Sequence, residues 1–514
     1  MIRSFEHYAS SFPERTAIIH SDGTTLTFGE VAVASALLSR LLEQVGTEAG
    51  DVVCALLPNG PDMLVMQRGV LQMPVYLSTI NWHLAPPEIA HILQDSKVRL
   101  FFTDCSLLEK AEHAFQLVGV PLEKLVIIDA DPEDPRSLAA RVSDLPPGRP
   151  DGISAGTRRL YTSGTTGKPK AVLRPLPGVA PHVYAQANIE RAALYGVDHE
   201  EGIYLSVAPM YHAAPLAYAD QALDLGHTVV ILPKWDAKLA LEAIRRHRVT
   251  WSYMVPLMFQ EMLARPAAEH DGVGSLRALV HTAAPCPPHV KRAMIEWVGP
   301  ILTEIYGGTE GSATVIRSED WLTHPGSVGR ARPGATIEIR DDEGRVLGPH
   351  DIGHIYFENR GLGFVYANDA EKTASSRIGN SVTLGDIGYM DEEGFLYLCD
   401  RLADIVISGG VNIYPAEIEH ALKECTWVAD ACVVGVPDER WGEALLAVVV
   451  TTGGPVDEEE RSEALTEHLR VRIAGFKVPR LFQYMDALPY SEAGKLLRRT
   501  VRETWGGHVI GPVA

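Results

Sequence analysis

The chain has 514 residues, of which 46% are hydrophobic and 22% are charged, proportions typical of a soluble globular protein. A chain of this length exceeds a single core, so we expect about three domain-sized units. The formal net charge of −20 argues against a general binder of nucleic acid or of anionic membranes. No run approaches the roughly 18 apolar residues that a membrane span requires. An anionic substrate would therefore need a local cluster of basic groups.

The sequence carries six cysteines with no CxxC pair and no regular spacing, namely Cys54, Cys105, Cys286, Cys399, Cys425 and Cys432. Residues 1–7 lack the apolar stretch of a secretory signal. We therefore expect free thiols in a reducing compartment and a cytoplasmic protein.

The first part of the chain alternates between helical and strand patterns. Residues 27–42 begin with a capping box, Thr27 and Glu30, and continue with a leucine stripe typical of a helix. A second helix is expected to start near Pro87, because proline is tolerated in a first helical turn. The runs typical of buried strands are 52–57, 98–102 and 125–128. This alternation predicts an α/β unit with parallel strands.

The alternation resumes after residue 156 and predicts a second layered α/β sheet. Its strand-like runs are 203–207, 228–232, 251–255, 278–281 and 301–305, and its clearest helical patterns are 237–247 and 288–298. From 326 to 398 the pattern changes to short strands with glycine turns at 341–344 and 391–394. This segment is expected to be a β-rich subdomain.

The last part of the chain is large enough to fold separately. It contains helical patterns at 415–424 and 458–473 and strand-like runs at 431–436 and 445–451. We therefore predict an α/β protein with two domains. Residues 1–400 form an N-terminal body of two layered sheets with its β-rich subdomain at about 326–398, and residues 401–514 form a small, mobile α+β lid.

The stretch Tyr161-Thr162-Ser163-Gly164-Thr165-Thr166-Gly167-Lys168-Pro169-Lys170 combines glycines, hydroxyl side chains and lysines. Successive amide groups in such a loop form a concavity that suits phosphate oxygens. It is not a Walker loop, because only two residues separate its glycines and Pro169 follows Lys168. Pro169 disfavours a helix start, so the loop is expected to join strands. Composition alone would equally suit a polar surface loop.

Five stretches in order along the chain resemble the motifs of the adenylate-forming superfamily, which includes acyl-CoA synthetases, luciferases and the adenylation domains of peptide synthetases. They are the loop 161–170, Tyr306-Gly307-Gly308-Thr309-Glu310, Leu384-Gly385-Asp386, the stretch 400–419 and Ser491-Glu492-Ala493-Gly494-Lys495. Together they span most of the chain, and on them it is identified as a member of this superfamily.

The resemblance implies that a carboxylate attacks the α-phosphate of ATP and releases pyrophosphate, leaving acyl-AMP. Two anions must meet in this step, so the site needs cations and fixed hydrogen-bond donors. The residues that the resemblance assigns to the phosphate cradle are Thr162, Ser163, Gly164, Thr165, Thr166, Gly167 and Lys170. The superfamily usually has glycine after that last lysine, whereas this chain has Ala171.

The resemblance also assigns the rest of the nucleotide site. Glu310 is implied to anchor Mg²⁺, which favours oxygen ligands, and Thr309 to touch the α-phosphate. Asp386 is implied to accept the ribose hydroxyls with help from Arg401. The adenine pocket would be formed by Ala283, Ala284, Pro285, Tyr306 and Gly307. Taken alone, Tyr306 would equally suit a protein core, and Asp386 a turn.

Lys495 resembles the lysine that bridges the substrate carboxylate and the α-phosphate during adenylation, although alone it would suit a solvated loop. In the thioester step, Gly409 and Gly410 are implied to line the path of coenzyme A. The hinge position holds Ala403, where the superfamily usually has lysine or aspartate. Alanine permits the backbone rotation of a hinge, but the usual charged contact is missing, so a slowed or separated thioester step stays open.

The stretch Met210-Tyr211-His212-Ala213-Ala214 resembles the border of the acyl pocket. It contains no acid, so an amino-acid substrate is not expected. The residues expected at this pocket are His212, Met254, Val255 and Gly308, although a lone histidine is often a packing residue. Apolar and methionine side chains favour a medium-chain, aromatic or polycyclic acid over acetate.

This resemblance predicts an acyl-CoA synthetase that uses ATP, Mg²⁺ and coenzyme A to activate a hydrophobic carboxylic acid. An alternative is an enzyme that makes acyl-AMP and passes it to a carrier protein or a separate ligase. A binding protein without catalysis is disfavoured, because the phosphate loop, Glu310, Asp386 and Lys495 are all present. Oxygen chemistry of the luciferase kind has no separate support.

Overall fold

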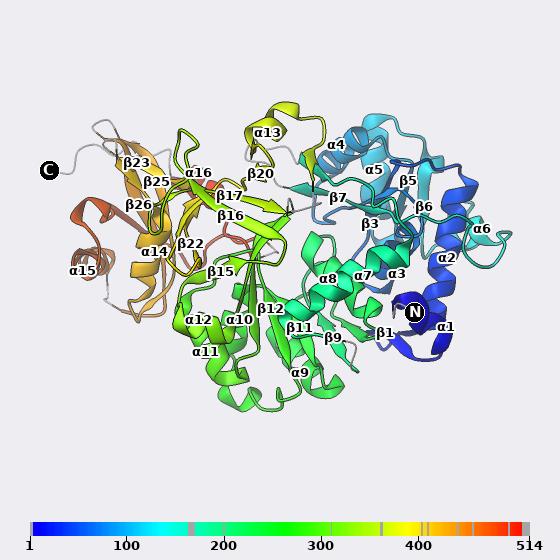
Figure 1. Cartoon of the computed structure of the whole chain (residues 1–514), viewed down its shortest axis with the longest axis horizontal. Coiled ribbons are helices and arrows are strands. Elements are labelled where there is room, and N and C mark those ends of the chain that lie inside the picture. The colour runs from blue at the N-terminus through cyan, green and yellow to red at the C-terminus, as the bar shows by residue number, and fades with distance from the viewer. Residues whose placement is uncertain are drawn as a thin grey trace.

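The computed structural model describes residues 4–162, 170–198, 201–309, 311–359, 363–401, 404–408, 411–438, 441–454, 457–491 and 494–505. They form three sheets with helices around them, and the first and third sheets lie at opposite ends of the molecule (Figure 1). The predicted α/β class, with a large N-terminal body and a small C-terminal unit, is confirmed.

The first sheet has seven strands in the order β18-β8-β7-β4-β3-β5-β6. Their bounds are β3 Val52–Leu56, β4 Tyr76–Thr79, β5 Leu100–Thr103, β6 Leu125–Ile127, β7 Thr157–Thr162, β8 Lys170–Leu173 and β18 Val365–Tyr366. The helices of this half are α1 Phe5–Ser11, α2 Phe28–Gln44, α3 Pro61–Val70, α4 Pro86–Ser96, α5 Leu108–Val118 and α6 Leu138–Val142. The predicted parallel unit is confirmed, because β3 to β7 all pair in parallel.

Alternate side chains of β3 enter two different cores, as expected for a sheet with both faces covered. Val53 and Ala55 pack toward α2 and α3, whereas Cys54 and Leu56 pack toward α4 and α5. Helix α2 begins with the predicted capping box, in which Thr27 and Glu30 bond each other's backbone amides.

The second sheet has fifteen strands, in the order β19-β20-β17-β21-β22-β15-β14-β13-β12-β11-β9-β10-β1-β2 with β16 on β17. The bounds of its first strands are β1 Thr16–His20, β2 Thr25–Thr27, β9 Ile203–Ser206, β10 Thr228–Ile231, β11 Trp251–Met254, β12 Ala278–His281, β13 Leu302–Gly308 and β14 Gly311–Arg317. The later strands are β15 Ser327–Ala331, β16 Ala335–Arg340, β17 Gly353–Asn359, β19 Arg377–Ile378, β20 Ser381–Val382, β21 Asp386–Met390 and β22 Leu396–Arg401. Its helices are α7 Pro181–Ala192, α8 Ala213–Asp224, α9 Ala237–His247, α10 Pro256–Leu263, α11 Pro288–Val298, α12 Ser318–Thr323 and α13 Ala370–Ser375.

Two features of this sheet differ from the pattern expected along the chain. Strand β1 comes from the N-terminal segment, yet it pairs in parallel with β10, so the first residues belong to the second sheet. The β-rich segment is not a separate sheet, because β15 pairs with both β14 and β22 and joins it to the parallel strands. The expected glycine turns are present, since Gly344 and Gly394 both have a φ of +80°.

The third sheet has five strands, β24-β23-β26-β25 with β27 on β26. The bounds are β23 Val406–Ser408, β24 Val411–Ile413, β25 Val428–Asp438, β26 Gly442–Thr451 and β27 Leu481–Tyr484, with helices α14 Pro415–Lys423, α15 Glu458–Arg470 and α16 Arg498–Trp505. Apolar side chains fill a separate core on each face of this sheet.

Strands β7 and β8 are antiparallel and pair Thr162 with Lys170, so the glycine-rich loop joins two strands as predicted. All six cysteines are free thiols, as expected. Among the described residues, no helix is long and apolar enough to cross a membrane.

Candidate active site

The parallel strands β9, β11, β12 and β13 end at one edge of the second sheet, and several of the predicted site residues lie at or just beyond those ends. Met254 and Val255 lie at the end of β11, and Ala283 follows β12. Tyr306 lies on β13, and His212 is the residue before α8. The carboxyl edge of parallel strands is where α/β proteins bind ligands.

Tyr306 and Asp386 are brought together from different parts of the chain. The Tyr306 hydroxyl donates to Oδ2 of Asp386 at 2.7 Å, and both residues are buried. Asp386 opens β21, where it lies opposite Arg401 of β22. The residues predicted to hold adenine and ribose therefore adjoin one another.

The backbone around the expected adenine pocket is unusual at two positions. Ala283 has a φ of +78°, a left-handed conformation that is rare without glycine. Strain of this kind clusters at functional sites. At Gly307 a Cβ atom would lie 2.5 Å from the carbonyl oxygen of Gly311, so no side chain fits there. Ala284 is half-buried, while Pro285 and Gly308 are exposed.

Two buried polar side chains of the first half hold the segment that leads to His212. The Asn59 side chain accepts from the Met210 amide at 2.7 Å and donates to the Ala208 carbonyl at 3.2 Å. Thr79, at the end of β4, donates to the Tyr211 carbonyl at 2.8 Å. Both side chains are about 5% exposed. No sequence pattern singled them out, although each is a polar residue at or just beyond the end of a buried strand.

Two arginines add further links across the same edge. Arg174, just after β8, donates to the Thr309 carbonyl at 2.9 Å, and Tyr76 donates to the Arg174 carbonyl at 2.8 Å. Arg158 of β7 donates to the Ala213 carbonyl at 3.3 Å. These hydrogen bonds therefore connect both strands that flank the glycine-rich loop to segments that contain predicted site residues. The sequence did not predict these contacts.

Burial lowers the pKa of His212 to about 4. Its ring lies 4.5 Å from the ring of Tyr211, centroid to centroid. The imidazole is therefore neutral at physiological pH, which suits it for hydrogen bonding or packing and not for a permanent positive charge.

The C-terminal unit reaches this edge through the turn that carries Lys495. The turn is closed by hydrogen bonds of 2.8 Å from the Gly494 amide to the Ser491 carbonyl and from the Ser491 amide to the Lys495 carbonyl. Gly494 is buried with a φ of +69°, and a Cβ atom there would lie 2.8 Å from Cγ2 of Val255. Lys495, which is exposed, therefore sits beside a predicted acyl-pocket residue.

Several predicted residues lie outside the described part of the chain. They are Ser163, Gly164, Thr165, Thr166, Gly167, Glu310, Ala403, Gly409 and Gly410. For Thr162, Lys170 and Arg401 the structure describes the backbone only. The described residues contain no group of three His, Cys, Asp or Glu side chains that could hold a metal ion. Glu310, the predicted magnesium anchor, is among the residues that the structure does not describe.

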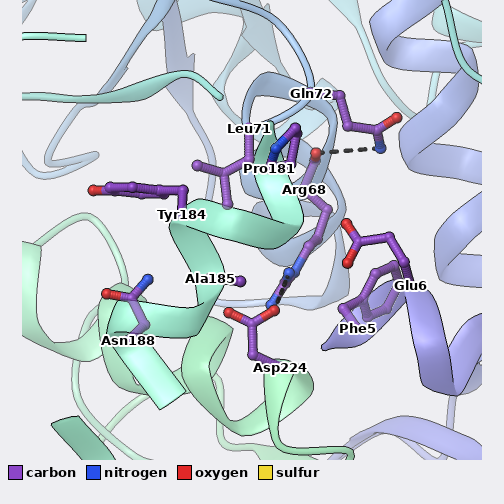
Figure 2. Close-up of a pocket in the computed structure, with 10 residues that line it drawn as sticks. All are labelled: Phe5, Glu6, Arg68, Leu71, Gln72, Pro181, Tyr184, Ala185, Asn188 and Asp224. Carbon is purple, nitrogen blue, oxygen red and sulfur yellow. Dashed lines mark hydrogen bonds and ion pairs between the residues drawn. The ribbon is translucent and has the colours of Figure 1, made fainter. Parts of the chain in front are cut away.

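A separate pocket lies away from these residues, between α1, α3, α7 and α8 (Figure 2). Figure 2 shows the Arg68 guanidinium between the carboxylates of Glu6 and Asp224. Arg68 is buried and forms ion pairs of 2.7 Å with both Asp220 and Asp224 of α8. Burial raises the pKa of Asp224, against the opposing effect of Arg68. The ion pairs fasten α8, whose first turn follows His212, to α3.

The sequence matches two families along most of its length. Residues 5–366 match the AMP-binding enzyme family, and residues 417–495 match the AMP-binding enzyme C-terminal domain.

Individual relatives cover nearly the whole chain. The chain is 30% identical to a fatty acid–[acyl-carrier-protein] ligase, ScoC, of Streptomyces coeruleorubidus, covering 99% of this chain and 96% of that protein. It is 31% identical to an indoleacetate–CoA ligase of Aromatoleum aromaticum, covering 97% and 96%. Among solved structures, the amide bond synthetase McbA of Marinactinospora thermotolerans superimposes with a TM-score of 0.85 at 27% identity, covering 95% and 97%.

These relatives share AMP-forming ligase chemistry and differ in the group that accepts the acyl unit. The family match covers both the body and the C-terminal unit that carries Lys495. The chain therefore belongs to the AMP-binding enzyme family and, with it, to the adenylate-forming superfamily of ATP-dependent ligases.

Proposed function

We propose that this protein activates a hydrophobic carboxylic acid with ATP, forming acyl-AMP and pyrophosphate, and then transfers the acyl group to the thiol of coenzyme A. In the first step a carboxylate oxygen bonds to the α-phosphorus, and the bond from that phosphorus to the bridging oxygen of pyrophosphate breaks. In the second step the thiol sulfur bonds to the acyl carbon, AMP leaves, and the thiol proton passes to solvent.

The observation that carries the proposal is the position of Gly494, the residue before Lys495, against Val255. A lysine ammonium beside the expected acyl pocket can neutralise both the incoming carboxylate and the α-phosphate, whose mutual repulsion opposes the first step. The contact at Gly494 supports this role, because it joins the residue before Lys495 to Val255, just beyond the end of β11.

We assign the nucleotide contacts as follows. Tyr306 offers its ring to adenine, and its hydrogen bond fixes the Asp386 carboxylate, whose remaining lone pairs accept the ribose hydroxyls. The loop 162–170 surrounds the β- and γ-phosphates, and Thr309 lies at the α-phosphate. Magnesium at Glu310 would supply positive charge to the phosphate oxygens. Neutral His212 stands at the mouth of the acyl pocket, with Met254, Val255 and Gly308 around it.

A second candidate function concerns the acceptor. Ala403 replaces the usual charged hinge residue, and ScoC, one of the relatives, is named for transfer to an acyl carrier protein. An enzyme that makes acyl-AMP and hands it to a carrier protein or to a separate ligase would share the same adenylation site.

The test is a pyrophosphate-release screen over a panel of carboxylic acids, with and without coenzyme A, followed by mass analysis of the products. An acid-dependent signal with an acyl-CoA product supports the synthetase. A signal without thioester, but with acylated carrier protein when carrier is added, supports the second candidate. No acid-dependent pyrophosphate from any member of the panel would overturn both.

A further inference from the structure

Helix α8 is buried along its length except for one stripe near His212. Ala213, Ala214, Ala217 and Tyr218 are partly exposed, and every other residue of the helix is buried. Ala213 and Ala217 are four residues apart, as are Ala214 and Tyr218, so each pair is aligned along the helix and the two pairs form adjacent rows of one stripe. Three of them are alanines, and Tyr218 closes the far end.

Farther along α8 the same face is covered. Gln221 donates to the Asn188 carbonyl and accepts from the Tyr195 hydroxyl, which brings α7 and the residues after it over the helix. The open stripe therefore begins beside His212 and stops at Tyr218.

Tyr218 is backed by aromatic rings that hold it in place. Its ring is stacked on that of Tyr253 with a centroid distance of 5.0 Å and an interplanar angle of 14°. The ring of Tyr195 meets it edge-on at 5.6 Å. Tyr253 is 2% exposed and Tyr195 3%, so Tyr218 is the member of this cluster that presents surface to the stripe.

The cluster is next in sequence to two residues that are predicted to line the acyl pocket. Tyr253 directly precedes Met254 and Val255 at the end of β11, and Val255 contacts the turn that carries Lys495. Burial raises the pKa of the Tyr218 phenol, while the nearby Arg191 guanidinium opposes that effect. The phenol is thus protonated at physiological pH and can both donate and accept a hydrogen bond.

Resting on the proposed function, we propose that Tyr218 is the floor of the acyl pocket and that the pocket takes an aryl-substituted carboxylic acid in preference to a long alkyl acid. Tyr218 lies six positions after His212 at the mouth, a rise of about 9 Å along the helix. That depth holds a ring joined to the carboxylate by a short linker, while an extended long-chain acid would run into the Tyr218 ring. The small side chains of Ala213, Ala214 and Ala217 leave the stripe open to a flat ring, and Tyr218 offers an aromatic edge or face to it.

The test compares acid preference in wild type and in two opposite variants. Pyrophosphate release is measured with cinnamic, 4-hydroxycinnamic, indoleacetic, octanoic and hexadecanoic acids. Wild type is expected to prefer the aryl acids by at least tenfold in kcat/KM over hexadecanoic acid. Tyr218→Ala should raise the activity with hexadecanoic acid relative to the aryl acids by about tenfold, the size of effect typical of reshaping an apolar pocket. Ala217→Phe should narrow the stripe and so lower the activity with hexadecanoic acid still further relative to the shorter acids of the panel.

Further controls separate the inference from the proposed function. Tyr218→Phe should keep the preference for aryl acids and lose activity mainly with 4-hydroxycinnamic acid. Tyr184→Phe, on α7 at the pocket of Figure 2, should leave the acid profile unchanged. Equal use of hexadecanoic acid by wild type, or an acid profile that neither Tyr218→Ala nor Ala217→Phe shifts, would overturn the assignment of Tyr218 while leaving the ligase intact. Should Tyr218→Ala fail to fold, the Ala217→Phe profile decides alone.

Discussion

Replacing Gly494 by alanine tests whether the contact between the C-terminal turn and the body is needed for adenylation. An added Cβ atom would lie 2.8 Å from Cγ2 of Val255 and 3.4 Å from Cβ of Leu257. The first distance is shorter than van der Waals contact, so Gly494 must move away from Val255 unless the Val255 side chain itself shifts. Lys495, the next residue, would move with it.

The size of the effect follows from two contributions. A left-handed φ of +69° costs alanine about 1–2 kcal/mol whether or not the turn touches the body. Overpacking against Val255 costs a further 1–3 kcal/mol, roughly, and only when the turn is docked. If docking is required for the first step, pyrophosphate release should fall by about 5- to 150-fold, since each 1.36 kcal/mol is a factor of ten.

The assay measures the two half-reactions separately. Acid-dependent pyrophosphate release reports adenylation, and conversion of supplied acyl-AMP by coenzyme A reports the second step. Gly494→Ala should slow the first selectively, and Val255→Ala should restore part of the loss in the double variant, giving a coupling energy in a double-mutant cycle. Gly394→Ala is the matched control, because Gly394 has a φ of +80° but its Cβ would meet nothing within 4 Å. An equal loss in both half-reactions, or no rescue by Val255→Ala, would refute the reasoning.

The remaining predictions concern catalysis, positioning and stability. Lys495→Ala should reduce pyrophosphate release by roughly 10²–10³-fold while still converting supplied acyl-AMP, and an equal loss of both steps would reject its role. Asn59→Ala leaves the Met210 amide unpaired and should cost about 1–3 kcal/mol of unfolding free energy, measured by denaturant titration, together with a raised KM for the acid. Arg68→Leu should cost about 3–5 kcal/mol in the same titration because two buried carboxylates lose their partner, and added Asp220→Asn and Asp224→Asn changes should recover much of it. For His212, the unfolded chain binds a proton below about pH 6.5 but the folded protein only near pH 4, so stability falls as pH drops through that window. His212→Gln should remove up to about 3 kcal/mol of the loss in unfolding free energy between pH 6.5 and pH 4, and less in proportion to the ring's partial exposure. If the variant loses as much unfolding free energy over this range as wild type, His212 is not shielded from water.

Helices and strands were predicted well where apolar residues recur at a clear helical or strand spacing. The helices at 237–247 and 288–298 have the expected bounds, because each has a clear apolar face and begins at a capping residue or a proline. Strands β9, β11 and β12 were found within one residue for the same reason, since buried parallel strands are short continuous apolar runs. Strand β13, in contrast, runs to Gly308, three residues beyond its predicted end.

Contacts between distant segments were not predictable from periodicity. Asn59 and Thr79 hold residues 208–211 from far away in sequence, and no local pattern states which backbone group a polar side chain will meet. The β-rich segment joins the parallel sheet because β15 pairs with a strand on each of its edges. A pattern of apolar residues predicts a strand but not its partners. The hydrogen bond between Tyr306 and Asp386 likewise joins two motifs whose order along the chain is known from the sequence but whose contact in space is not.

The placement of β1 also bears on how the chain is made. Ile18 pairs with Val229, so β1 is synthesised well before β10 and one of its two edges stays unpaired until β10 is made. At the usual pace of synthesis this interval lasts about 10 to 40 s. During it the apolar residues of β1 lack their native neighbour, and a nascent-chain chaperone that shields this short segment should raise the yield of active enzyme.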